Sequence, residues 1–320
     1  VAAAEGAASA LPSVAAVCAA KCVRRLCVGF FFVAGQAIIG DVAASDPERM
    51  GSVIGVQVAL ISAGFFVGAI ASGWLAEFGL SASYGTSAAL QALNALFVSL
   101  ALRETLPPEN RTPFEARSAP KLLLQSPLSC TKILFGRGRK IRILAMILLF
   151  QTLPGSMDGF FQIFTKSEWN LEMKEYSSFV AIFGVIGIVA NTVGSQAVPK
   201  LGIRNYTSVA ALSCTLAPLG AILFSFRGLL AGSILGFLGA AQQLGVSAAL
   251  IAEGATSGVP QGELAGERSS FLALCGVVGP VWYSTLYVQG KKIIGSKNLP
   301  FVFNALLAVG VFAISRIHLS

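Results

Sequence analysis

The chain alternates between long apolar runs and short polar breaks, and this pattern predicts membrane-spanning helices. A bilayer core of about 30 Å needs about 20 consecutive apolar residues in a helix. Seven runs of roughly this length contain no charged residue. These runs are 51–76, 83–102, 176–199, 205–226, 228–252, 269–290 and 298–315.

Two further runs are spans only if they tolerate ionisable side chains. The run 22–43 contains Arg25 and Asp41, and the run 143–165 contains Asp158. With these two runs, we expect an all-α membrane protein with nine transmembrane helices. A tenth candidate, the Ala-rich stretch 4–20, is interrupted by a proline, and it fits a span, a transit remnant or a surface helix.

One long polar segment interrupts the series and predicts a linker at 104–142. From Arg103 to Arg142 the chain carries nine basic residues against three acidic ones. Because positive charge resists translocation, this segment is expected in the cytoplasm. It divides the chain into an incomplete N-terminal bundle of three or four spans at 1–103, the linker, and a six-helix C-terminal bundle at 143–320.

Composition supports a membrane protein and excludes other classes. Hydrophobic residues make up 55% of the chain and charged residues 12%, whereas a soluble domain has about 25% charged residues. The net charge of +8 would suggest nucleic acid in a soluble protein. Here the excess gathers in a polar loop, so we expect no nucleic-acid partner.

The sequence contains few of the residues and motifs that enzymes use to make or break covalent bonds. The six cysteines form no C-x-x-C pair, and His318 is the single histidine, so neither a zinc site nor a Ser-His-Asp triad is expected. No G-x-x-x-x-G-K-[ST] loop is present to bind ATP. We therefore expect no enzyme activity, no cofactor and no metal.

Glycines in the run 51–76 carry the clearest resemblance to a known family. Their spacing is similar to the fifth-helix antiporter motif G-x8-G-x3-G-P-x2-G-G of the major facilitator superfamily. Ala69 stands at the proline position and Ser72 at one glycine position. The matching positions are Gly55, Gly64, Gly68 and Gly73.

Other segments agree with this resemblance. Arg25 with Gly29 resembles the R-x-x-x-G of the family's fourth helix, and Asp41 opens a segment similar to its D-x-x-x-x-E-R-G loop. The segment 261–266, QGELAG, resembles the tetracycline-resistance and hippocampus-abundant-transcript-like transporters. The family's plan is six helices, a basic inner loop and six helices, so this chain is expected to lack about two N-terminal spans.

The resemblance implies a multi-pass membrane protein that moves a small organic solute by alternating access. It further implies antiport against protons by a monomer in a lipid bilayer. The alternative is a non-transporting or degenerate family member, such as a structural subunit, because the family's first-helix acid and main inner-loop motif are absent.

Three ionisable residues are candidates for transport and proton coupling: Asp158, Arg25 and Asp41. An Asp at the centre of a span costs about 2.5–3.5 kcal/mol on insertion scales, so Asp158 is expected to face a cavity. The alternative is a position close enough to the outer headgroups to be hydrated. Arg25 fits either a cavity cation or a side chain that reaches the interface.

The motif glycines and the uncharged polar residues supply the remaining candidates. The glycines allow close helix packing, either as a general contact or as a seal against leak between the two halves. Tyr283 fits either stacking on a flat substrate or an interfacial belt. The candidates for the substrate cavity are Gln151, Gln242, Gln243, Asn94 and Tyr283.

Overall fold

The computed structural model describes residues 1–10, 13–24, 47–102, 130–259 and 261–319, together with single positions 27, 35 and 38. In these ranges every regular element is a helix and none is a strand. Five of the helical stretches described are long and apolar enough to cross a membrane. The all-α membrane fold predicted from the hydrophobic runs is thus confirmed.

The chain divides into two compact units, and the first contains α1 (Ala2–Ala10), α4 (Leu80–Ala101) and most of α3 (Pro47–Glu77). Helix α1 packs on α4, where the Ser9 hydroxyl donates to the Ser81 carbonyl at 2.7 Å. The Ala-rich stretch 4–20 falls on α1 and on helical residues from 14 onward. Most of the run 22–43 lies outside the described residues.

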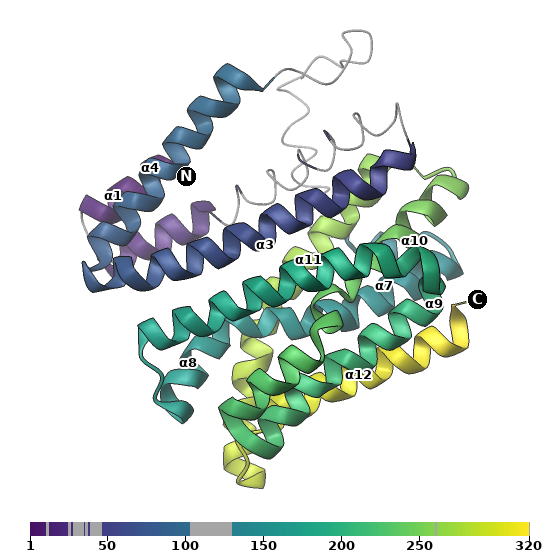
Figure 1. Cartoon of the computed structure of the whole chain (residues 1–320). Coiled ribbons are helices and arrows are strands. Elements are labelled where there is room, and N and C mark those ends of the chain that lie inside the picture. The colour runs from purple at the N-terminus through teal and green to yellow at the C-terminus, as the bar shows by residue number, and fades with distance from the viewer. Residues whose placement is uncertain are drawn as a thin grey trace. The chain divides into compact units, whose positions relative to one another are not determined.

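The second unit holds the helices that follow the linker (Figure 1), except that residues 173–181 belong to the first unit, and it also holds residues 55–63 of α3. Its span-length helices contain breaks: the span 139–169 consists of α7, a 3-10 turn at η2 and α8. Another 3-10 turn, η3, precedes α10. The elements are α6 (Cys130–Phe135), α7 (Arg139–Thr152), η2 (Leu153–Met157), α8 (Asp158–Trp169), α9 (Met173–Leu235), η3 (Phe237–Ala241), α10 (Gln243–Thr256), α11 (Gln261–Gln289), η4 (Gly290–Ile294) and α12 (Leu299–His318).

Helix α9 is three helical sections in series rather than one rod. Its backbone leaves helical geometry at Gly202, with φ 72°, and at Phe224 and Ser225, where Ser225 has φ 58°. A residue with positive φ and non-helical ψ interrupts the helix and allows the chain to change direction before the next section. These breaks fall close to the polar boundaries of the runs 176–199, 205–226 and 228–252. The first two runs each have their own section of α9, whereas the third comprises the last section of α9, η3 and most of α10.

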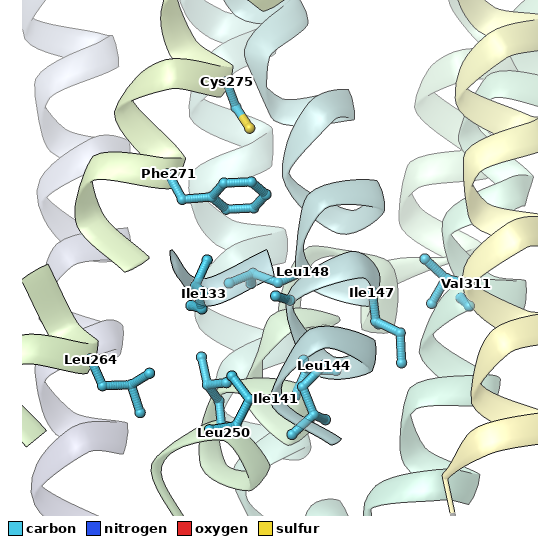
Figure 2. Packing of buried hydrophobic residues seen from close by; sticks show 13 residues of the cluster. Ile133, Ile141, Leu144, Ile147, Leu148, Leu250, Leu264, Phe271, Cys275 and Val311 are labelled. Carbon is cyan, nitrogen blue, oxygen red and sulfur yellow. The ribbon is translucent and has the colours of Figure 1, made fainter. Parts of the chain in front are cut away.

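The core of the second unit forms around α7 (Figure 2). This helix contacts α10, α11 and α12, and its residues Ile141, Leu144, Ile147 and Leu148 are buried. Conversely, many large apolar side chains on the outside of the helices are exposed, Leu306 at 63% among them. An apolar exterior around a packed centre is what a bundle surrounded by lipid requires.

Glycines bring the second and third sections of α9 into close backbone contact. A Cβ built on Gly228 would overlap the Gly220 carbonyl, and one on Gly232 would overlap the Leu216 carbonyl. A Cβ on Gly236 would likewise overlap the Ser213 carbonyl. Gly228, Gly232 and Gly236 are spaced four residues apart, and this small-xxx-small pattern is typical of close helix pairs in membranes.

We predict that Gly232→Ala destabilises the second unit because its methyl group has no room beside the Leu216 backbone. Overpacking of this kind costs about 1–3 kcal/mol. The melting temperature of the detergent-solubilised protein should fall by several degrees. The matched control is Gly276→Ala on α11, where a Cβ meets nothing within 4 Å. Equal melting temperatures for the two variants would contradict the close packing.

Candidate functional site

Three glutamines predicted to face a substrate cavity occur together where α7 and α10 meet. The Gln151 side-chain amide donates to the Gln242 backbone carbonyl at 2.9 Å, and the Gln242 amide donates to the Gln151 carbonyl at 3.2 Å. Gln243 donates to the Thr152 hydroxyl at 3.3 Å. Gln151 is 2% exposed, and its Oε1 has no hydrogen-bond partner among the described residues.

The helix breaks explain why glutamines stand at these positions. Helix α7 ends at Thr152 before η2, and η3 ends at Ala241 before α10. At such junctions backbone carbonyls lose their regular partners and need others, because lipid offers none. The two reciprocal glutamine bonds and the Tyr206 hydroxyl, which donates to the Ala241 carbonyl at 2.9 Å, supply them. The sequence analysis did not single out Tyr206.

Tyr283 lies inside the second unit, with a side chain that is fully buried. Its hydroxyl donates to Asn304 Oδ1, and the Asn304 amide lies 3.6 Å from Met157 Sδ. The aromatic ring therefore packs within the bundle. Its hydroxyl connects α11 to Asn304 of α12, and the Asn304 amide contacts η2.

Asp158 is exposed and is the first residue of α8, directly after the η2 turn. Asn94 is exposed on α4, in the other unit. The coupling candidates Arg25 and Asp41 lie outside the described residues. Asp158 is thus the one coupling candidate whose position the structure describes.

The motif glycines of α3 differ in their surroundings. Gly73 is buried, and a Cβ there would lie 2.7 Å from Ser177 Oγ of α9. Gly64 and Gly68 are exposed, with no described atom within 4 Å of a built Cβ. Gly55 lies in α3, but its surroundings are outside the described part of the chain. Among the motif glycines whose surroundings are described, Gly73 is the one at which α3 lies in close contact with α9.

Arg137 joins the segment before α7 to the first turns of α11. Its Nη2 lies 2.5 Å from Glu263 and 2.6 Å from Glu267, whose side chain is 2% exposed. Lys132 of α6 lies 3.9 Å from Glu263 and completes this group, which we call the Arg137 cluster. The hydrogen bond with Glu267 holds the pKa of Arg137 above its usual value.

A second charged group lies at the other end of the unit. Glu168 of α8 accepts hydrogen bonds from Tyr287 and Lys291, and Lys297 lies 3.3 Å away. Phe164, which contacts Tyr287 edge-on with ring centroids 5.6 Å apart, packs beside it. These contacts tie the C-terminal end of α8 to the chain between α11 and α12.

Arg268 is a charged residue that the sequence analysis did not select. Its Nη2 donates to Ser247 Oγ of α10 at 2.8 Å, and its Nε is enclosed without a partner among the described residues. The predicted run 269–290 begins directly after Arg268, whereas α11 already begins at Gln261. Arg268 therefore lies about two turns inside a helix rather than before its start.

Comparison with known proteins identifies the family. The sequence profile described as Major Facilitator Superfamily matches residues 1–284. The chain belongs to the major facilitator superfamily. It is accordingly a multi-pass integral membrane protein, and the family predicted from its glycine spacing is confirmed. A search of curated proteins found no match.

Among solved structures, this superfamily member is similar to the crystal structure of the human organic anion transporter MFSD10 (TETRAN). The TM-score is 0.74 at 19% sequence identity. The match covers 98% of this chain and 74% of the other. At that identity the likeness establishes the fold alone.

We predict that Arg137→Gln destabilises the second unit strongly because it leaves Glu267 buried without a counter-charge. Removing one partner of a buried pair costs about 3–5 kcal/mol. The matched control is Lys140→Gln, since Lys140 lies 3.7 Å from Glu253 with a side chain 79% exposed, and exposed pairs contribute about 0–1 kcal/mol. Thermal unfolding in detergent compares them, and similar losses would contradict the assigned role of Glu267 burial.

Proposed function

We propose that this chain is a secondary active transporter that moves a small organic solute by alternating access, in exchange for protons. Membership of the superfamily supports transport as the general activity. The observation that carries the proposal is the pair of broken helices in the second unit, which meet at Gln151 and Gln242.

Broken helices are a physical basis for a solute site. Where a membrane helix is interrupted, backbone and side-chain polar groups become available to a ligand near the membrane midplane. At the junction of α7 and α10 the glutamines donate to the freed carbonyls, and Gln151 Oε1 has no hydrogen-bond partner among the described residues. A solute that donates a hydrogen bond to this oxygen would supply that partner.

Proton exchange is assigned to Asp158. It is an ionisable side chain within the helical stretch 139–169 that hydropathy identifies as a span, and it is exposed rather than packed in the core. Arg25 and Asp41 are proposed to act with it, as the family resemblance implies. The similarity to an organic anion transporter makes organic anions the first substrate class to examine.

We predict that Asp158→Asn removes the pH dependence of uptake, because the amide neither takes up nor releases a proton. Purified protein in liposomes is given an inward or outward pH gradient, and uptake of radiolabelled organic anions, neutral solutes and cations is measured. Glu172→Gln, an exposed acid between α8 and α9, is the matched control and should behave as the unmodified protein. Unchanged pH dependence in Asp158→Asn would remove this residue from proton coupling.

We also predict that Gly68→Leu impairs transport while membrane insertion persists. The proposed seal of α3 depends on small residues along its length, and a leucine prevents close approach by another helix. Proton leak and solute uptake are measured in the same liposomes. Val67→Leu, a neighbouring substitution at an exposed side chain, serves as the control. Normal coupled transport by Gly68→Leu would refute the sealing role.

A further inference from the structure

The N-terminal part of α11 carries one positive charge that no described carboxylate neutralises. Arg268 donates to the neutral hydroxyl of Ser247, and its Nε is enclosed without a described partner. An ion pair with Arg268 is absent from the part of the chain that the structure describes. Taking a charge out of water is expensive unless a counter-charge and hydrogen bonds compensate for it.

The acids closest in sequence are already paired elsewhere. Glu263 and Glu267 share the Arg137 cluster with Arg137 and Lys132, so that cluster contains two carboxylates and two cations. Glu253, near the C-terminal end of α10, lies 3.7 Å from Lys140. Neutralising Arg268 with Glu263 or Glu267 would leave the two cations of that cluster with one carboxylate, and using Glu253 would leave Lys140 without its carboxylate.

The surroundings of Arg268 favour a ligand with oxygen acceptors. Ser247 and Gln243 lie four residues apart and therefore on one face of α10, about one turn from each other. Arg268, Ser247, Gln243 and Thr152 are all partly exposed, so this strip is not sealed within the apolar core. Guanidinium and amide groups present N–H donors, and the hydroxyl of Ser247 has a proton to donate, whereas Thr152 donates its own to the Leu148 carbonyl at 2.7 Å.

A guanidinium is well suited to binding an anion. It is always charged and offers several N–H groups in a planar fork that matches a carboxylate or phosphate. Among the described residues, Ser247 accepts from Nη2 and nothing accepts from Nε, so the guanidinium has donor capacity for an anion. The hydroxyl of Ser247 fixes the orientation of that fork.

We propose that Arg268, oriented by Ser247, binds the carboxylate, sulfonate or phosphate group of a small organic anion, and that Gln243 contacts a second polar group of the same ligand one helical turn away. As a step in transport, this site rests on the proposed function; as a binding site, it stands independently. The phosphate of an anionic lipid has the same chemistry and is distinguished by experiment.

Binding is tested with purified full chain in phosphatidylcholine nanodiscs, using benzoate, 1-naphthalenesulfonate and phenyl phosphate as probes and neutral benzamide as the reference. Losing a charge-assisted hydrogen bond should weaken anion binding by Arg268→Gln about 10- to 100-fold. Ser247→Ala should weaken it less. Arg268→Lys, which keeps the charge, should restore part of the affinity. The reference affinity for benzamide should not follow this order.

The matched control is Arg142→Gln, which removes an exposed arginine from α7 of the same unit. It should leave anion binding unchanged. The proposal is overturned if the unmodified protein binds none of the three anions, or if Arg268→Gln binds them as well as the unmodified protein does. Should Arg268→Gln fail to fold, the comparison of Ser247→Ala with the unmodified protein decides the question.

Two further experiments distinguish a lipid phosphate from a soluble anion, and the anion-binding site from the proposed transport. Nanodiscs containing phosphatidylglycerol test the lipid: Arg268-dependent stabilisation by this lipid, together with displacement of the soluble probes, supports the anion site and assigns a lipid phosphate to it. In liposomes, uptake of organic anions that is unchanged in Arg268→Gln overturns the site as a step in transport but keeps the transporter. Arg268-dependent anion binding without uptake of any solute supports the site and overturns the transporter.

Discussion

The need to satisfy every backbone polar group without water determines this structure. In lipid an unpaired N–H or C=O costs several kcal/mol, and a continuous helix is the simplest way to pair them all. Each departure from a continuous helix must therefore have a substitute partner. At the junction of α7 and α10 the partners are amide side chains, because Gln151 and Gln242 each donate to the other's carbonyl. The positions of these two glutamines follow from the helix breaks.

The spans were predictable because hydrophobic runs of about 20 residues leave few alternatives. The same logic identified Gln151, Gln242 and Gln243, since an amide within an apolar run must find a partner in the protein. The breaks at η2 and η3 were not predictable from hydropathy, which responds to side chains and not to backbone hydrogen bonding. Pro154 and Gly155 signal the first break in the sequence, but nothing comparable marks the second.

Other features were missed because their signal is weak in a glycine-rich chain. With 34 glycines in the sequence, the close pairing of Gly228, Gly232 and Gly236 with the preceding helical section does not stand out. Arg268 fell outside the predicted run 269–290 because charges were used to mark the ends of spans. The structure begins α11 at Gln261, so Glu263, Glu267 and Arg268 all lie on a helix. Which of them are paired depends on distant residues such as Arg137.

The second unit combines a rigid part with a part that has room to change. The backbones of the second and third sections of α9 approach so closely that even a methyl group is excluded. This contact leaves little freedom for one section to slide against the other. Beyond this contact, η3 separates the last section of α9 from α10, and η2 separates α7 from α8; such 3-10 turns often mark hinges. The reciprocal glutamine bonds connect these two interruptions, so a change in one alters the partners of the other. A solute that binds at this junction would therefore act on both hinges together.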